Sequence, residues 1–319
     1  MEGRAAALGA GTVLNALATG TGAAFGIDVE TRASVELDPE STTGHVEGSI
    51  VEASDADTEL IERCVALATD RWGDGEDGTV ETESDVPLAA GLKSSSAAAN
   101  ATILATCAAL GLRVGDDPED PAVDVTRLEA CRLGVRAARE AGVTVTGAFD
   151  DATASMLGGV CLTDNGADAL RRREPVDWEV LVWTPPERAY SADADVDRCA
   201  SVAPMADLVA DLAADGRYVE AMTVNGLAFS AALGFDPDPA VEAMPDVAGV
   251  SLSGTGPSVV AVADPDEPAH DLDAVADRWN ERPGTLRRTT TRNDGARIVD
   301  RSTERDEFDA STNHDIDKP

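Results

Sequence analysis

The stretch VPLAAGLKSSSAAAN, Val86 to Asn100, combines a glycine turn, a lysine and a serine-rich helix start. Lys93 is the only lysine apart from Lys318. Gly91 permits a tight turn, and serines such as Ser94 to Ser96 often cap helices. The first turn of the helix expected after them, Ser96 to Leu110, offers unpaired N–H groups and a positive dipole end to an anion. We therefore predict a phosphate-binding loop, and an ordinary helix start beside a turn is the alternative.

This loop differs from two common nucleotide motifs. It lacks the Gly-x-x-x-x-Gly-Lys-Ser/Thr pattern of a P-loop and the Gly-x-Gly-x-x-Gly pattern of a dinucleotide site. Further glycine-rich segments lie at Gly9–Thr12, Thr19–Gly22, Gly147–Ser155 and Ser251–Ser258. The first two separate the predicted strands Gly3–Leu8 and Ala24–Leu37, where they indicate either backbone close to a ligand or flexible turns.

The charge balance is strongly acidic. The 319 residues include 25 Lys+Arg against 60 Asp+Glu, for a formal net charge of -35. The acidic residues are dispersed along the chain, which is typical of a surface adapted to molar salt, where the screening length is about 3 Å. An acidic partner of basic proteins is the alternative, and nucleic-acid binding through a basic surface is disfavoured.

The remaining composition limits the chemistry. The cysteines are odd in number, widely spaced and without a Cys-x-x-Cys pair, which disfavours zinc and redox sites and indicates a reducing cytoplasm. The three histidines are scattered, which argues against a histidine triad or metal cluster. Met1 to Ala10 lacks the pattern of a signal peptide, and we expect no membrane span.

Strands and helices alternate irregularly along the chain, which predicts an α+β protein of two parts. We expect an N-terminal domain over residues 1–160, a C-terminal domain over 161–300 and a disordered polar tail from Arg301 to Pro319. The predicted strands are Thr43–Val51, Gly78–Ser84, Trp178–Trp183, Val247–Leu252, Ser258–Ala263 and Thr285–Thr291. The predicted helices are Thr58–Trp72, Val125–Ala141, Pro204–Ala214, Tyr218–Leu233 and Leu272–Trp279.

The chain resembles the GHMP small-molecule kinase superfamily in three segments, Val86 to Ser96, Gly147 to Ser155 and Ser251 to Ser258. Pro87 to Ala97 is similar to its ATP loop, and Ser251 to Ser258 is similar to its C-terminal glycine motif. Within the superfamily, Gly91 to Ser96 and Thr146 to Ala152 resemble the archaeal shikimate kinases, as does the glycine-rich start of the chain. The similarity runs through residues 1 to 300 in motif order.

The resemblance implies the GHMP two-domain fold, with an N-terminal domain like a ribosomal-protein domain and a ferredoxin-like C-terminal domain. It implies transfer of the γ-phosphoryl group of ATP to the 3-hydroxyl of shikimate, in aromatic amino-acid biosynthesis, with Mg²⁺ as cofactor. Another GHMP kinase, acting on homoserine or mevalonate, is the first alternative, and a nucleotide-binding protein without activity is the second. The oligomeric state stays open.

The same resemblance assigns roles to residues. Lys93 and one of Asp150 and Asp151 are the catalytic candidates; counting back from Gly158 favours Asp151, and counting forward from Gly147 favours Asp150, with the other expected to cap the helix. Ser95 or Ser96 is expected to reach Mg²⁺. The nucleotide-binding candidates are Val86, Pro87, Leu88, Ala89, Ala90, Gly91, Leu92, Lys93, Ser94, Ser95, Ser96, Gly254, Thr255 and Gly256.

The acceptor contacts are less defined. The shikimate carboxylate calls for an arginine, and the candidates are Arg4, Arg32, Arg136 and Arg139, although the last two also fit a solvated helix face. Thr12, Asn15 and Thr146 are candidates for the ring hydroxyls.

Overall fold

The computed structural model describes residues 1–87, 89–144, 147–189 and 194–299. The predicted disordered tail, Arg301 to Pro319, lies outside the described residues, as do Leu88 and Thr146.

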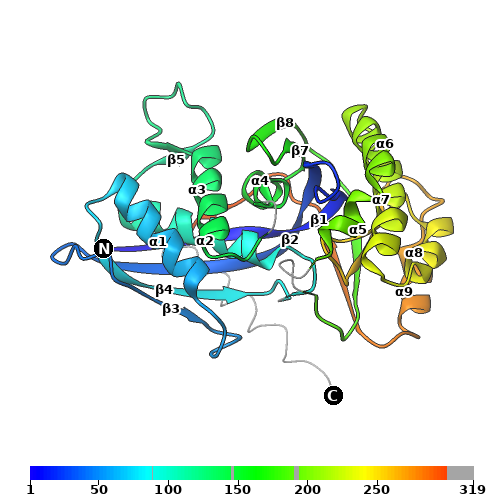
Figure 1. Ribbon diagram of the computed structural model, residues 1–319, viewed down its shortest axis with the longest axis horizontal. Coiled ribbons are helices and arrows are strands. Elements are labelled where there is room, and N and C mark those ends of the chain that lie inside the picture. The colour runs from blue at the N-terminus through cyan, green and yellow to red at the C-terminus, as the bar shows by residue number, and fades with distance from the viewer. Residues whose placement is uncertain (88, 145–146, 190–193, 300–319) are drawn as a thin grey trace, which may run out of the picture.

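A seven-stranded sheet forms the first part of the molecule (Figure 1). Two long strands at its centre, β1 (Glu2–Leu14) and β2 (Thr21–Asp38), make an antiparallel pair. The remaining strands are β3 (Val46–Ile50), β4 (Asp77–Ser84), β7 (Val160–Asp164), β8 (Ala169–Glu174) and β13 (Arg297–Ile298). The order is β13-β1-β2-β4-β3, and β7 pairs with the start of β2 and with β8. Only the β3–β4 pair is parallel among the described pairings of this sheet.

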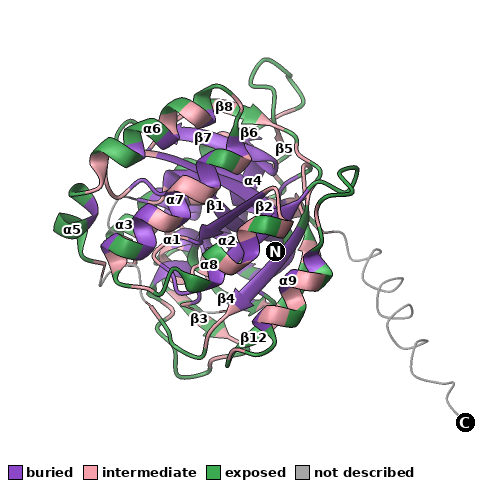
Figure 2. Ribbon diagram, turned by 90° about the vertical axis from the view of Figure 1, so that its right-hand side faces the viewer, coloured by how far each residue is buried: buried purple, intermediate pink, exposed green. Residues whose placement is uncertain are grey.

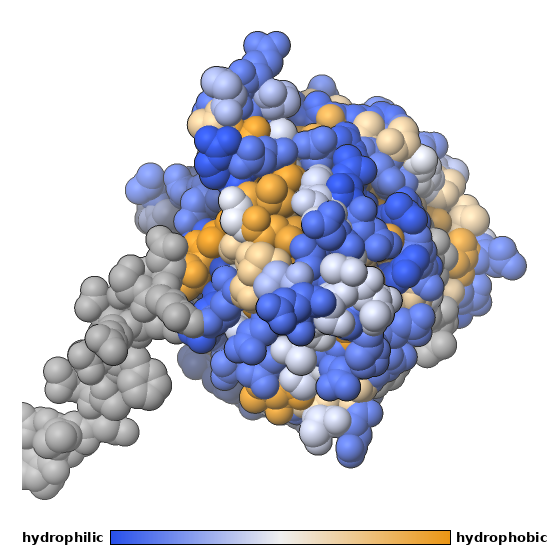
Figure 3. Space-filling model, turned by 90° about the vertical axis from the view of Figure 1, so that its left-hand side faces the viewer, coloured by the Kyte–Doolittle hydropathy of each residue, from blue (hydrophilic) through white to orange (hydrophobic). Residues whose placement is uncertain are grey.

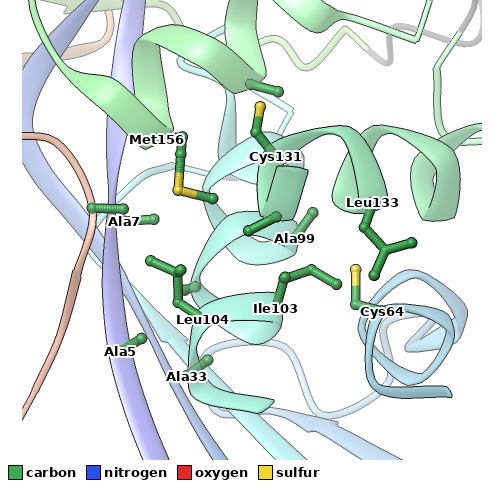
Figure 4. Close-up of a cluster of buried hydrophobic side chains, with 14 of the residues drawn as sticks. Ala5, Ala7, Ala33, Cys64, Ala99, Ile103, Leu104, Cys131, Leu133 and Met156 are labelled. Atoms are coloured by element: carbon green, nitrogen blue, oxygen red, sulfur yellow. The ribbon is translucent and has the colours of Figure 1, made fainter. Parts of the chain in front are cut away.

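Helices α1 (Glu59–Trp72), α2 (Ser94–Ala109), α3 (Arg127–Glu140) and α4 (Phe149–Leu157) pack against this sheet. A pair of short strands, β5 (Val114–Gly115) and β6 (Val125–Thr126), lies between α2 and α3 in the chain. Figure 4 shows Leu104 of α2 pointing toward Ala5 and Ala7 of β1, and Ile103 pointing the other way, toward Cys64 of α1, in the core of this first part. The alanines of β1 let α2 approach the sheet closely, and this buried helix carries the predicted phosphate loop at its N-terminus.

A second, four-stranded sheet contains β9 (Glu179–Thr184), β10 (Gly249–Leu252), β11 (Val259–Ala263) and β12 (Thr285–Thr290). Its order, β10-β11-β9-β12 with every pair antiparallel, is that of a ferredoxin-like sheet and confirms the predicted fold class. The accompanying helices are α5 (Val196–Ala200), α6 (Ala203–Ala214), α7 (Tyr218–Leu233), α8 (Asp238–Ala243) with the 3-10 turn Met244–Asp246, and α9 (Leu272–Trp279). Figure 2 shows the central strands β1 and β2 largely buried and the helices with one exposed side.

The two sheets share a hydrophobic core. Leu14 and Phe25, near the connection of β1 and β2, are buried in the same cluster as Phe229 of α7 and Val260 of β11. Phe25 also makes an edge-on contact with Trp178, with ring centroids 5.3 Å apart. The long hairpin of the first sheet therefore reaches into the second part of the molecule and fixes the two parts against each other.

The sheets do not separate at a single point in the sequence. Strands β7 and β8, after residue 160, and β13, near the end of the described chain, all belong to the first sheet. Within the first sheet, Gly9 and Gly11 lie inside β1, which contradicts the flexible-turn interpretation of Gly9–Thr12 and extends the predicted strand Gly3–Leu8. A Cβ on Gly11 would come within 2.4 Å of the Phe25 ring, so this glycine makes room for core packing.

The acidic surface leads to a prediction about salt. Figure 3 shows one face of the molecule covered mainly by hydrophilic side chains, and the net charge is -35. Because unscreened like charges destabilise a compact chain, we expect the native circular-dichroism spectrum to require molar KCl and to be lost in dilute buffer. A native spectrum and full activity at low salt would contradict this expectation.

Candidate active site

A cavity of about 910 Å³ lies between the end of β1, the start of α2 and the start of α4. It has walls from both parts of the molecule, because Gly254 and Thr255 after β10 and Arg188 after β9 line it. A second hollow, of about 670 Å³, contains Glu174, Tyr218 and His270 but none of the glycine-rich motifs. The residues that line the larger cavity include Thr12, Asn15, Glu52, Asp55, Ala89, Gly91, Lys93, Ser94, Ser95, Thr144, Asp150, Asp151, Arg188, Gly254 and Thr255.

The predicted phosphate loop is held from three directions. Ala10 of β1 donates its N–H to Leu92 O at 3.1 Å, and Ala189 donates its N–H to Ala89 O at 3.0 Å. Ser253 Oγ donates to Gly91 O at 2.8 Å. Val86 and Leu92 are buried in the core that the two sheets share. The loop is thus fixed by backbone contacts while its middle faces the cavity.

Gly91 marks the closest approach of the loop to the C-terminal glycine motif. Its φ is +79°, and a Cβ added there would lie 2.2 Å from Ser253 O and 2.9 Å from Gly256 O. Both the left-handed conformation and the backbone contact exclude a side chain. The two motifs, far apart in sequence, are therefore packed backbone against backbone.

Gly254 is held in turn by β1. Its N–H donates to Thr12 Oγ1 at 2.8 Å, and its carbonyl accepts from Asn15 Nδ2 at 2.8 Å. A Cβ on Gly254 would lie 2.6 Å from Lys93 Nζ, so the ammonium packs directly over this glycine. Thr12 and Asn15 line the cavity, as predicted for acceptor contacts, but they already position the glycine turn.

Lys93 and Asp151 form an ion pair at the cavity wall. Lys93 Nζ lies 2.9 Å from Asp151 Oδ1, and the side chains are 4% and 18% exposed. Within the described residues no hydrogen bond reaches that carboxylate oxygen, so the ammonium is its charge partner. Although it belongs to a loop, Lys93 is not a surface charge, because the whole residue is only 8% exposed.

The neighbouring Asp150 has a different environment. Its carboxylate Oδ1 accepts a hydrogen bond from Asn165 Nδ2 at 2.7 Å, and the residue is 4% exposed. Burial and the nearby Asp151 raise the pKa of Asp150 to about 7. The structure thus separates two adjacent carboxyl groups: one is buried against an amide, and the other faces an ammonium at the cavity.

Two predicted helix caps are not formed. The N-cap of α2 is Lys93, at φ +69° and without a capping side-chain bond, and Ser94 to Ser96 lie in the first turn. The N-cap of α4 is Ala148, again without a side-chain cap, and neither aspartate takes that role. The N-terminus of α2 therefore lacks a side-chain cap next to the cavity, whereas in the first turn of α4 the Asp150 N–H donates to Asn165 Oδ1 at 3.1 Å.

The predicted site residues divide into those at the cavity and those behind it. Ser94 and Ser95 line the cavity, whereas Ser96 is buried and does not. Val86, Pro87, Ala90, Leu92 and Gly256 also lie outside the lining, where they support the loop.

None of the four predicted arginines lines the cavity. Arg4 pairs with Glu2, Arg32 lies near Glu30, Arg136 pairs with Glu140, and Arg139 makes two 2.7 Å bonds to Asp168. The arginine at the cavity is Arg188, which the sequence interpretation missed, and no carboxylate pairs with it in the described parts of the chain. No local sequence signal marked it, since Arg188 follows Pro185-Pro186 and Glu187 in a loop after β9.

A family model and individual curated proteins both match this chain. The family model for the N-terminal domain of GHMP kinases matches residues 59–159. A curated shikimate kinase of Halobacterium salinarum is 62% identical over 94% of this chain and 100% of its own length. The chain belongs to the archaeal shikimate kinases of the GHMP superfamily. A shikimate kinase of Methanosarcina mazei is 50% identical over 84% of this chain and 87% of its own length.

The fold of this shikimate kinase family member also occurs in solved structures. A homoserine kinase from Cytophaga hutchinsonii superimposes with a TM-score of 0.72 over 93% of this chain and 97% of its own, at 15% identity. In this chain, the range that matches the GHMP family model includes Lys93, Asp150 and Asp151.

Over the residues that the structure describes, no helix combines the length and the apolar character that a membrane span requires. The same residues contain no cluster of metal-ligating side chains.

Proposed function

We propose that the protein transfers the γ-phosphoryl group of ATP to the 3-hydroxyl of shikimate. The observation that carries the proposal is the Lys93–Asp151 ion pair, 2.9 Å long, at the cavity between the phosphate loop and the C-terminal glycine turn. Phosphoryl transfer depends on positioning and on stabilising spreading negative charge, and this cavity combines a cation, a carboxylate and a helix N-terminus. The 62% identity to a shikimate kinase supports the acceptor.

The first turn of α2 is our candidate for the ATP phosphates. Its N-cap provides no side-chain acceptor, and Ser94 and Ser95 line the cavity. The N–H groups of this first turn and the positive end of the helix dipole stabilise phosphate oxygens there. The Lys93 ammonium adds a full positive charge beside them.

Asp151 is our candidate for the general base. Its carboxylate takes the proton of the 3-hydroxyl as that oxygen attacks the γ-phosphorus, and ADP leaves with the electrons of the broken P–O bond. Lys93 holds the carboxylate in place and lies near the developing charge. Asp150 is a poorer candidate because Asn165 and burial occupy its carboxylate.

The cavity offers few protein oxygens that could coordinate Mg²⁺. Ser95 is exposed and lines the cavity, whereas Asp151 Oδ1 already faces an ammonium. Because Mg²⁺ binds mainly phosphate and water oxygens in such sites, we assign Ser95, and not the buried Ser96, as its protein ligand. The ion would neutralise phosphate charge.

Arg188 is our candidate for the acceptor carboxylate. It lines the same cavity as Asp151, and the acidic residues Glu52 and Asp55 of that cavity repel a carboxylate. The Arg188 guanidinium pairs with no carboxylate of the described residues, and a guanidinium binds a carboxylate through two parallel hydrogen bonds. The five free, buried cysteines are consistent with a cytoplasmic location, which we propose.

An acceptor panel tests the function. We expect ADP release in molar KCl with ATP, Mg²⁺ and shikimate, and none above background with homoserine or mevalonate. The methyl ester of shikimate lacks the charge that Arg188 binds, so its KM should rise by roughly tenfold or more. ADP release with homoserine or mevalonate but not with shikimate would refute the assignment, and equal KM values for ester and acid would refute the role of Arg188.

A further inference from the structure

Asn165, in the connection after β7, contacts Asp150 through both ends of its amide. Asn165 Nδ2 donates to Asp150 Oδ1 at 2.7 Å, and Asn165 Oδ1 accepts from the Asp150 backbone N–H at 3.1 Å. Thr163 Oγ1 donates to the same Asn165 Oδ1 at 2.8 Å. Asn165 is 2% exposed and Thr163 is fully buried. The amide thus orients both the carboxylate and the backbone of Asp150.

The other side of Asp150 is closed by β2. A Cβ on Gly22 would lie 2.4 Å from Asp150 Oδ2, so the carboxylate packs onto the glycine backbone. Thr163 pairs with Gly22 across the sheet, and the Asn165 N–H donates to Gly20 O at 2.9 Å. The first turn of α4 is therefore tied to the first sheet at Asp150, one residue before the carboxylate that faces Lys93.

We propose that Asn165 is a positioning residue for phosphoryl transfer, which orients Asp151 toward Lys93 by fixing Asp150 at the start of α4. This inference rests on the proposed function. The N-cap residue of α4 is Ala148, which has no polar side chain that could hold the start of this helix. The Asn165 contacts replace that cap, and small displacements of a catalytic group cost large factors in rate.

Replacement by aspartate gives a reversible test. Protonated aspartate has the shape of asparagine, with one O–H to donate to Asp150 and one oxygen to accept from its N–H and from Thr163. Ionised aspartate places a negative charge beside the Asp150 carboxylate and cannot donate. The charged groups that act on Asp150 are Asp151 of α4 and Lys93 before α2. Beside position 165 itself, Arg139 of α3 donates to the backbone Asn165 O at 3.4 Å, whereas Thr163 and Gly22 are neutral.

We therefore expect Asn165→Asp to lose activity as pH rises. Its kcat should approach that of the wild type at about pH 6, where the adjoining carboxyl groups at positions 150 and 165 share a proton and remain hydrogen-bonded. It should fall by roughly tenfold or more relative to the wild type at about pH 8.5, where both groups are ionised and repel each other. The KM for ATP should stay unchanged, since the phosphate loop is untouched. Circular dichroism in molar KCl at each pH verifies that the variant is folded.

Asn293→Asp is the matched control. Asn293 Nδ2 donates to Asp177 Oδ1 at 3.1 Å, and its Oδ1 accepts from the Val176 N–H at 3.0 Å, so it repeats the same pattern away from the cavity. We expect its kcat to follow the wild type at every pH. A parallel loss in both variants would show a general effect of the added charge and would overturn the proposal.

A second variant decides the case if Asn165→Asp does not fold. Thr163→Val keeps the buried shape but removes the hydroxyl that holds Asn165, so we expect kcat about threefold lower with an unchanged KM for ATP. An unchanged kcat in Thr163→Val, or a pH-independent kcat ratio for Asn165→Asp, overturns the inference alone. Wild-type protein that releases no ADP with shikimate would refute the proposed function, and this inference with it.

Discussion

Asp151→Asn is expected to lower kcat by roughly 10²- to 10⁴-fold while leaving ATP binding nearly unchanged. The substitution preserves the shape of the side chain but removes the proton acceptor. A base acts on the hydroxyl only during transfer, so its loss affects turnover more than affinity. Single-turnover ADP formation and titration of ATP, both in molar KCl, measure the two effects separately.

Asp150→Asn is the matched comparison for this result. Asparagine at position 150 still offers an oxygen to Asn165 Nδ2, so the start of α4 should stay in place and kcat should fall by less than about tenfold. The two variants differ by one position and carry the same chemical change. If Asp150→Asn is the inactive one, the roles of the neighbours are reversed, and if both retain full kcat, no aspartate base operates here.

Gly91→Ala is expected to reduce kcat/KM for ATP by roughly 10²-fold or more. The new Cβ would start 2.2 Å from Ser253 O, so the phosphate loop and the glycine turn must separate by more than an ångström to restore ordinary contact. That movement shifts Lys93, whose ammonium packs over Gly254. Steady-state kinetics with varied ATP measure the loss.

Gly111→Ala separates this contact from backbone strain. Gly111 has φ +73° but nothing within 4 Å of an added Cβ, and it follows the opposite end of α2. Both variants should lose about 1–2 kcal/mol of folding free energy from the left-handed conformation, yet only Gly91→Ala should lose activity. Equal activity of the two variants would show that the approach of the two motifs is unimportant for catalysis.

The regular elements of the fold follow closely from local sequence patterns. Helix α7 and helix α9 have the bounds that apolar periodicity predicts, Tyr218–Leu233 and Leu272–Trp279. The pattern failed where tertiary contacts override it. The first strand was expected to end at Leu8, but β1 continues through Gly9, which packs against the loop, and Gly11, which packs against Phe25. Strand β13 is too short for any periodicity and exists only because it pairs with β1.

The candidate site was predictable in its motifs and not in its long-range contacts. The order of the motifs along the chain indicated Lys93 and the aspartate pair as candidates. No local pattern separates Asp150 from Asp151. The distinction comes from Asn165, which reaches Asp150 from another segment. Arg188 was missed for the same reason, since only the folded chain brings the end of β9 to the cavity.

The central claim, phosphorylation of shikimate on its 3-hydroxyl, is tested most directly by the structure of the product. Wild-type protein is incubated with ATP, Mg²⁺ and shikimate in molar KCl, and the product is examined by phosphorus–proton correlated NMR. We predict one phosphate monoester, with its phosphorus coupled to the proton on carbon 3. Unmodified shikimate beside inorganic phosphate, or phosphorus coupled to another ring proton, would contradict the account.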